Sequence, residues 1–330
     1  MQVRVEILKS PTSSVSGQAG TAVSGFASGY PVNDPLYRRQ QPYLEFAGVP
    51  AAWMRLAPVT GKRKRVTVAL IDSGVKRDHA DLVKNLIEGY NVIKHTTSTP
   101  DKYGHGTLMA GVLGATINNT IGIAGVMDLV NIMPISLEND ATDEPEADSI
   151  DYAIRNKDTK GVKIILMAIS GEVRRPKVTE KIKEAVAAGL LVIVTAGNRG
   201  YDITKDKRYP CALTEHLPGM LCVAATRNTE MKLDTVSNYG DYVDIAAPGV
   251  DILTTFVQQP YHTFRGTSPA AAIVAGVAAM LYSINPVLSP VAVKAILKDT
   301  SKKGIKLDDS DALLFGLVDA DAAVAKVLSR

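Results

Sequence analysis

From about residue 33 onward, short apolar runs alternate with longer segments of helical periodicity. Four runs are almost continuously apolar, which predicts parallel strands buried on both faces at residues 66–72, 130–136, 162–170 and 190–197. Segments with helical length and spacing lie between or beside them, at residues 105–115, 148–157 and 178–189. This alternation predicts an α/β fold: a single doubly wound domain with a mainly parallel central β-sheet and helices on both faces.

The amino-terminal segment does not share this pattern. Residues 10–30 are dominated by Ser, Gly, Ala and Thr and lack periodicity, which predicts a flexible arm or linker at residues 1–32 and a folded domain at residues 33–330. The first thirty residues also lack the charged start, apolar stretch and cleavage site of a secretory signal. The longest apolar stretch, residues 270–281, is shorter than the roughly 18 residues of a membrane span. We therefore expect a soluble protein without a membrane span.

Composition and charge narrow the functional classes. The chain has 330 residues, of which 46% are hydrophobic and 22% charged, enough apolar material for a large core. Its 37 basic and 34 acidic residues give a net charge of +3, too balanced to indicate a nucleic-acid partner. The one dense basic run, Lys62–Arg65, is interpreted as a solvated loop. Two cysteines, Cys211 and Cys222, fit either a reduced cytosolic protein or one disulfide in an exported protein.

Polar residues lie at the carboxyl ends of the predicted strands and at a helix start, where doubly wound sheets usually carry their reactive groups. Asp72 ends the run at 66–72, Asn198 follows the run at 190–197, and Ser268 opens the most apolar helix. His105 lies between two glycines at the start of a predicted helix. An aspartate after a strand more often caps a turn, and Asn198 alone fits a turn residue. The order Asp, His, Ser, with each residue in a Gly-rich context at a strand end or helix start, favours a nucleophilic serine activated by histidine.

The motifs around these residues resemble the signature segments of the subtilisin family: DSG at Asp72, GHGT at His105 and GTS at Ser268. Family-like segments continue over about residues 33–325, including TAGN, which ends at Asn198. The resemblance implies a catalytic domain at residues 33–330 that is a serine endopeptidase acting through an acyl-enzyme. Asp72, His105 and Ser268 would be its triad, and Asn198 with the Ser268 N–H its oxyanion hole. It also implies peptide or protein substrates and extracellular or secretory-pathway residence, and an inhibitory propeptide is common in the family.

The segment INNTIGI at residues 117–123 resembles the loop that binds calcium in this family. The resemblance implies a Ca²⁺ site with hard oxygen ligands. These ligands would be the side chains of Gln40, Asp81 and Asn119 and the carbonyl groups of Ile117, Ile121 and Ile123. The alternative is a glycine-containing turn that needs no metal.

The sequence departs from the family pattern beside the expected substrate site. Ala168, Ile169 and Ser170 replace the usual Ser, Leu and Gly of the substrate-binding strand, and Pro269 follows the serine in place of the usual Met. These changes leave open the alternative of a catalytically inactive subtilase-fold protein that binds peptides. A lipase-like α/β-hydrolase is excluded because the chain lacks the G-x-S-x-G motif and has the wrong order of triad residues.

The resemblance also places two arginines near the pocket for the side chain that precedes the scissile bond. Arg199 follows the oxyanion asparagine, and Arg208 lies in the segment RYPC. Two guanidinium groups would repel basic side chains, which leads to the hypothesis that acidic or polar side chains are accepted there. A Cys211–Cys222 disulfide would hold the pocket wall if the protein is exported, and reduced cysteines are the alternative.

Overall fold

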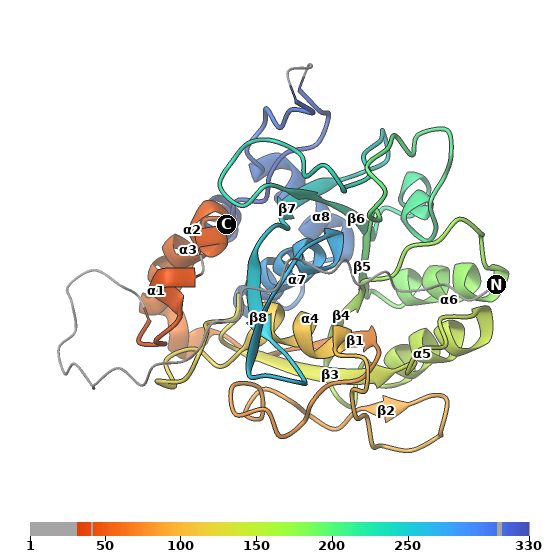
Figure 1. Cartoon of the computed structure of the whole chain (residues 1–330), viewed down its shortest axis with the longest axis horizontal. Coiled ribbons are helices and arrows are strands. Elements are labelled where there is room, and N and C mark those ends of the chain that lie inside the picture. The colour runs from red at the N-terminus through yellow and green to blue at the C-terminus, as the bar shows by residue number, and fades with distance from the viewer. Residues whose placement is uncertain (1–31, 41, 309–311, 330) are drawn as a thin grey trace.

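The computed structural model describes residues 32–40, 42–308 and 312–329, so the arm predicted at residues 1–32 lies, apart from Val32, outside the described residues. Within them, seven strands form one parallel sheet in the order β2-β3-β1-β4-β5-β6-β7 (Figure 1). The strands are β1 (Val66–Asp72), β2 (Tyr90–Asn91), β3 (Val130–Ser136), β4 (Val162–Met167), β5 (Leu191–Thr195), β6 (Met220–Thr226) and β7 (Ile245–Pro248). The predicted α/β class with a parallel sheet is confirmed.

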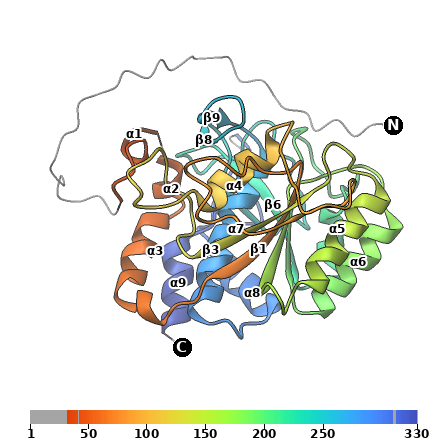
Figure 2. The ribbon, with the colours of Figure 1, turned by 90° about the horizontal axis from the view of Figure 1, so that it is seen from below.

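Helices cover both faces of the sheet, and Figure 2 shows the two layers. One face carries α5 (Asp143–Arg155) and α6 (Pro176–Ala187). The other carries α3 (Val49–Leu56), α4 (His105–Gly114), α7 (Thr267–Ile284), α8 (Pro290–Thr300) and α9 (Ala320–Leu328). The remaining short elements are α1 (Tyr37–Gln40), α2 (Pro42–Phe46), η1 (Ala57–Lys62), η2 (Cys211–Glu215) and an antiparallel hairpin of β8 (Ile252–Thr255) and β9 (Tyr261–Phe264).

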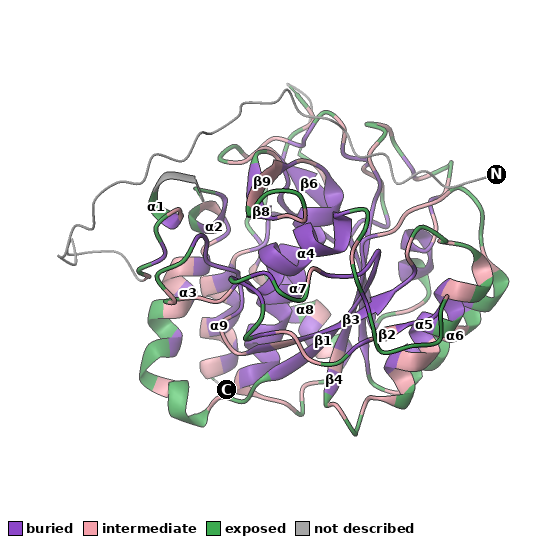
Figure 3. Cartoon of the chain, turned by 60° about the horizontal axis from the view of Figure 1, so that its bottom comes forward, coloured by how far each residue is buried: buried purple, intermediate pink, exposed green. Residues whose placement is uncertain are grey.

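Helix α7 lies at the centre of the larger core. Its residues from Thr267 to Ser283 are buried, and Figure 3 shows α7 and α4 as the most completely buried helices. By length and composition alone α7 could cross a membrane, but 94% of it is buried inside the fold. A helix that is apolar all round is the pattern of a core helix as much as of a membrane span. The burial of α7 therefore assigns it to the core.

The continuous apolar runs predicted the strands well. β1 and β3 occupy the predicted residues 66–72 and 130–136, whereas β4 and β5 end at Met167 and Thr195, short of the predicted 170 and 197. The residues beyond these ends leave the sheet to form the site described below. Helix α5 begins at Asp143, five residues before its predicted start. Pro145 does not prevent this, because it lies in the first turn, where its missing N–H is not needed.

The prediction of a solvated loop at Lys62–Arg65 is wrong for one of its residues. The Arg63 side chain is only 2% exposed and forms a bidentate pair with Asp128, at 2.7 and 2.8 Å. Its Nε also donates to the Ser283 hydroxyl at 3.0 Å. Arg63 therefore ties the segment before β1 to the end of α7, a contact between residues too distant in sequence for charge patterning to predict.

Candidate active site

The sheet order brings the predicted site residues to one edge. β1 lies between β3 and β4, and β4 is followed by β5, so the carboxyl ends of β1, β4 and β5 are neighbours. Asp72 is the last residue of β1, residues 168–170 follow β4, and Asn198 follows β5. His105 and Ser268 lie at the amino-terminal ends of helices α4 and α7, which meet the same edge of the sheet. This is the crevice at which doubly wound sheets bind their ligands.

Asp72 and His105 form a close buried pair. His105 Nδ1 lies 2.8 Å from Asp72 Oδ1 and 2.9 Å from Oδ2, and both side chains are less than a tenth exposed. The Ser73 backbone N–H also donates to Asp72 Oδ1 at 2.7 Å. Because a carboxylate can only accept, this geometry assigns the proton of the ring to Nδ1 and leaves Nε2 available as the base.

Asp101 is a residue of this site that sequence reasoning missed. Its Oδ1 accepts hydrogen bonds from the Ser73 hydroxyl and from the N–H groups of Tyr103 and Gly104, at 2.7–3.1 Å. Its Oδ2 accepts from the N–H and hydroxyl of Thr107, at 2.9 and 2.6 Å. Asp101 therefore fixes the first turn of α4, on which His105 stands. The N-cap position of α4 is Gly104, so Asp101 lies three residues before the place where a capping carboxylate is expected, and no local pattern identified it.

The environment favours the protonated form of His105. Burial by itself would lower the pKa of this imidazole, but the charge of Asp72, the hydrogen bond that His105 donates to Asp72 and the charge of Asp101 outweigh this effect. The pKa of His105 is therefore raised above its ordinary value of 6.5. The ring also packs edge-on against Phe264 of β9, with centroids 5.7 Å apart. An imidazole held this way binds a proton more readily than a free one.

Ser268 lies in the first turn of α7, as predicted, beside the same crevice. Its hydroxyl lies 3.5 Å from the Ala168 carbonyl oxygen, and the described residues contain no hydrogen bond between Ser268 and His105. Catalytic hydrogen bonds are often long or misaligned before substrate binds. Pro269 lacks an N–H and lies where helix N–H groups have no helical partner, so this departure leaves the helix start intact.

Asn198 is oriented by the residue before the serine. Its Oδ1 accepts from the N–H and the hydroxyl of Thr267, at 2.8 and 2.9 Å. This assigns the carbonyl end of the amide to Thr267 and leaves Nδ2 facing the crevice, with no partner in the described part of the chain. A side chain at Gly266 would lie about 3.1 Å from the same amide, and Gly266 has a φ of 136°. Only glycine fits there without strain.

An open cleft of about 600 Å³ joins these groups. It is lined by His105, Asn198, Ser268 and residues 168–173. The backbone N–H and C=O groups of Ile169 and Ser170 have no hydrogen-bond partner among the described residues, so they form a free edge beside the cleft. The Ser170 hydroxyl lies against Ala196 and Gly197 rather than along this edge.

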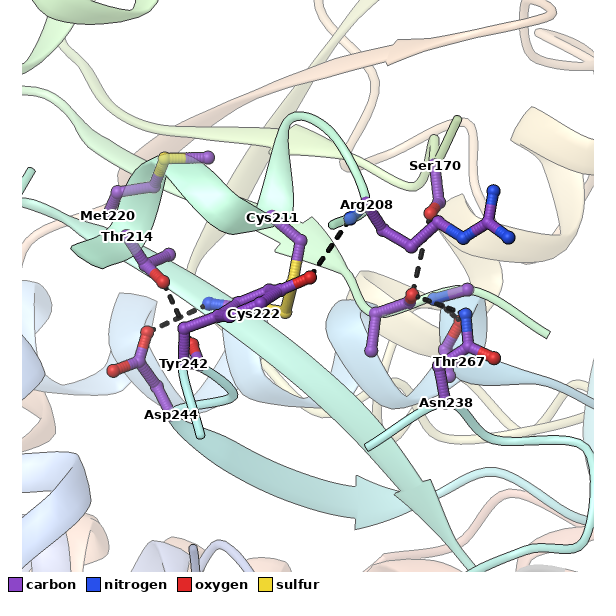
Figure 4. Close-up of a disulfide and its surroundings, with 12 residues drawn as sticks. Ser170, Arg208, Cys211, Thr214, Met220, Cys222, Asn238, Tyr242, Asp244 and Thr267 are labelled. Atoms are coloured by element: carbon purple, nitrogen blue, oxygen red, sulfur yellow. Dashed lines mark hydrogen bonds between the residues drawn. A yellow bond between two sulfur atoms is a disulfide. The ribbon is translucent and has the colours of Figure 1, made fainter. Parts of the chain in front are cut away.

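Arg199 and Arg208 line the cleft and share one carboxylate. Glu172 Oε1 lies 2.7 Å from Arg199 Nη1 and 2.8 Å from Arg208 Nη1, a partner that sequence reasoning did not identify. Three residues beyond Arg208, Cys211 forms a disulfide with Cys222 of β6, across a Cα–Cα distance of 5.1 Å (Figure 4). The two cysteines, whose state the sequence left open, therefore anchor the wall that carries Arg208 to the sheet.

The predicted calcium loop lies away from the cleft, beside the start of β9. Asp81 is fully buried, and its carboxylate accepts hydrogen bonds from the Asn119 amide at 2.7 Å, the Ile123 N–H at 3.0 Å and the Tyr261 hydroxyl at 3.1 Å. Asn119 Oδ1 accepts from the Ile121 N–H at 2.8 Å. Burial raises the pKa of Asp81 above its ordinary range, although the three hydrogen bonds oppose this.

Asp34 is a second carboxylate at this loop that sequence reasoning missed. Its two oxygens accept from the N–H groups of Asn118 and Asn119, at 2.9 and 3.1 Å. Burial, with the nearby charge of Asp81, raises its pKa. The side chain of Gln40, the predicted ligand from the amino-terminal region, lies outside the described residues. Asp34 lies in the segment NDPLY at residues 33–37, at the start of the range over which the sequence resembles the family.

Comparison with known proteins places this arrangement in a family. The profile of the subtilase family matches residues 63–317. Thermitase of Thermoactinomyces vulgaris is 30% identical over 277 residues, covering 83% of this chain and 92% of thermitase. An intracellular serine protease of Paenibacillus polymyxa is 34% identical over 246 residues, covering 72% and 71% of the two chains. The solved structure of a Pseudoalteromonas arctica protease superimposes with a TM-score of 0.78 at 26% identity, covering 90% of this chain and 99% of that one. The chain therefore belongs to the subtilase family of serine proteases.

Proposed function

We propose that this serine protease hydrolyses internal peptide bonds with Asp72, His105 and Ser268 as its catalytic triad. His105 Nε2 takes the proton of Ser268 as Oγ attacks the scissile carbonyl carbon. The same nitrogen then gives that proton to the leaving amine, the C–N bond breaks, and an acyl-enzyme ester remains on Ser268. Water activated by His105 hydrolyses the ester and restores the serine. Asp72 keeps the Nδ1 proton in place and stabilises the imidazolium formed in each step.

Two donors are available for the negative charge that develops on the carbonyl oxygen. The Asn198 Nδ2 group is free in the described part of the chain and is held in orientation by Thr267. The backbone N–H of Ser268 lies in the first turn of α7, where helix N–H groups have no helical acceptor. Donors fixed before the charge appears need no reorganisation during the reaction, which is the main source of their stabilising effect.

The substrate backbone has a matching edge. The N–H and C=O groups of Ile169 and Ser170 lack partners among the described residues, so an extended peptide can pair with them as an added strand. Main-chain pairing of this kind depends little on side-chain identity. The departures from the family pattern at residues 168–170 are therefore compatible with peptide binding, and we propose these residues as the substrate-binding strand.

The observation that carries the proposal is the buried Asp72–His105 pair beside a serine and a free asparagine amide in one cleft. An inactive peptide-binding protein would keep the strand edge but would have no need for the oriented amide or the buried carboxylate. Labelling with a fluorophosphonate probe distinguishes the two functions. We expect labelling of the intact protein and none of Ser268→Ala. Absence of labelling in a folded sample of the intact protein would favour the binding protein.

We also propose a structural Ca²⁺ at the loop of residues 117–123, and the donor set fits this ion. Asp34 and Asp81 supply two buried carboxylates, and the carbonyl oxygens of Ile117, Ile121 and Ile123 accept no hydrogen bond in the described residues. Hard oxygen donors of this kind suit Ca²⁺, which would offset the charge of two neighbouring carboxylates. Asn119 would have to present its amide oxygen, rather than the nitrogen that now donates to Asp81. The bound ion would stabilise the fold and takes no part in the reaction.

We propose that the protein works in an oxidising compartment, outside the cell or in the secretory pathway. The Cys211–Cys222 disulfide supports this, because such bonds are rare where thiols are kept reduced. Mass measurement after thiol alkylation, without reductant, tests it: two alkylated cysteines in protein from its native source would contradict the proposal. The inhibitory propeptide implied by the family resemblance stays a prediction.

A further inference from the structure

The cleft contains a charged cluster that the proposed chemistry does not use. It consists of Arg199, Arg208 and Glu172, and all three residues line the same cleft as Ser268 and Asn198. Their side chains differ in exposure: Arg199 is 60% exposed and Glu172 48%, whereas Arg208 is 10% exposed. The most buried charge of the cluster is therefore the Arg208 guanidinium. Glu172, the only carboxylate of the cluster among the described residues, lies nearer to the solvent.

Arg208 is held in place on several sides. Its backbone N–H donates to the Tyr242 hydroxyl at 2.9 Å, and its carbonyl accepts from Ala212 at 2.7 Å. Its guanidinium carbon lies 4.9 Å from the centre of the Tyr201 ring. Figure 4 shows the side chain extending from the disulfide region toward Ser170. A buried guanidinium that is already ordered loses little entropy when it binds a carboxylate.

The charges of the cluster do not balance. Two guanidinium groups share a single carboxylate, which leaves one positive charge in excess, and Arg208 Nε is buried without a hydrogen-bond partner in the described residues. Burial of an arginine with incomplete pairing is unfavourable. The other charged residues that line the cleft are already engaged: Arg175 pairs with Glu146, and Asp143 accepts from backbone N–H groups at the start of α6.

The position of the cluster relative to the reacting groups identifies the part of the substrate it meets. In the proposed reaction the scissile carbonyl lies between Ser268 and Asn198. The side chain of the residue that supplies this carbonyl branches from the next carbon, so it enters the cleft beside Asn198. Three of the residues that line the cleft lie near this point: Arg199 follows Asn198 in the chain, Ser170 packs against Gly197, and the Arg208 side chain extends toward Ser170 (Figure 4).

We propose that this cleft selects an acidic side chain, Asp or Glu, at the residue that supplies the scissile carbonyl, with Arg208 as the specificity-determining residue. The proposal rests on the proposed peptidase function. In the free enzyme Glu172 pairs with Arg208 in place of the substrate carboxylate. When the substrate binds, its carboxylate displaces Glu172 toward Arg199. Glutamine, which has the same shape without the charge, binds less well, and lysine is rejected because it would add a third cation.

Chromogenic peptides that differ only in this residue test the proposal. We expect kcat/KM for the glutamate peptide to exceed that for the glutamine peptide by about tenfold, the lower end of the range for hydrogen bonds to charged groups, because Glu172 competes. Arg208→Met should reduce this ratio to about one or below. Glu172→Gln, at an exposed position, should raise kcat/KM for the glutamate peptide several-fold more than for the glutamine peptide. Arg155→Met, on α5 outside the cleft, is the matched control and should leave the ratio of kcat/KM between the glutamate and glutamine peptides unchanged.

Fluorophosphonate labelling of each variant reports whether Ser268 remains activated, so loss of folding in Arg208→Met is recognised separately. In that event Glu172→Gln decides the question alone. Labelling with cleavage of the glutamine peptide, but without an advantage for glutamate, would overturn the specificity and leave the peptidase function standing. Absence of both labelling and cleavage for every peptide would overturn the peptidase function and the specificity with it.

Discussion

Replacement of Asp101 by asparagine tests whether His105, the proposed base, depends on a carboxylate outside the proposed triad. Asn keeps the size of the side chain and one acceptor oxygen, which can still serve Ser73 and Gly104. An NH₂ group then takes the place of Oδ2, opposite the Thr107 N–H. Thr107 is fully buried, so its N–H loses its acceptor without gaining water.

The expected effect has two separate parts. A buried N–H without an acceptor costs about 1–3 kcal/mol, so the free energy of unfolding should fall by about that amount. Asp101 also helps to raise the pKa of His105, and removal of its charge should move the acid limb of kcat/KM to lower pH. Urea denaturation measures the first part, and the pH profile of a chromogenic peptide measures the second.

A matched control separates these effects from loss of any surface carboxylate. Asp140→Asn changes an exposed aspartate that, among the described residues, accepts a side-chain bond from the Thr142 hydroxyl at 2.7 Å. It should leave both the unfolding midpoint and the acid limb unchanged. If Asp101→Asn lowered stability but left the acid limb in place, Asp101 would cap α4 without acting on His105. If neither quantity changed, the reasoning from its five hydrogen bonds would be refuted.

Three further outcomes are expected. Asn198→Ala should lower kcat roughly 100- to 1,000-fold, the effect of removing this donor in a subtilisin, and should change KM little. Steady-state kinetics measure both constants, and a rise in KM alone would contradict the assignment. The acid limb of kcat/KM in the intact protein should lie above pH 6.5, since His105 acts as a base only when neutral and its pKa is raised; a limb below 6.5 would count against this. The same shift stabilises the fold below pH 6.5, and this contribution is lost as the pH rises through the folded pKa. Ca²⁺ at 100 times its Kd should stabilise the intact protein by about 2.7 kcal/mol, measured by thermal unfolding. Asp81→Asn should abolish most of this stabilisation, and equal stabilisation of both proteins would place the ion elsewhere.

Hydrophobic patterning predicted the sheet because its strands are buried on both faces. β1 and β3 have almost no residues that contact water, so their apolar runs begin and end where the strands do. The hairpin of β8 and β9 had no such signal. Its residues include polar threonines whose hydroxyls donate to the α4 backbone, as Thr254 does to Leu108 at 2.6 Å. Such contacts depend on what the hairpin packs against, which a local pattern does not contain.

The sequence alone identified the candidates for the proposed chemistry, because each of these residues lies at a strand end or helix start in a short motif. Asp72, His105, Asn198 and Ser268 could all be identified in this way. Only the tertiary structure decided which groups complete the site. The contacts of Asp34 with residues 118 and 119, and of Glu172 with two arginines, join segments 27 to 85 residues apart. Such pairings are set by the packing of the sheet and loops, and their energies depend on burial that the sequence does not display.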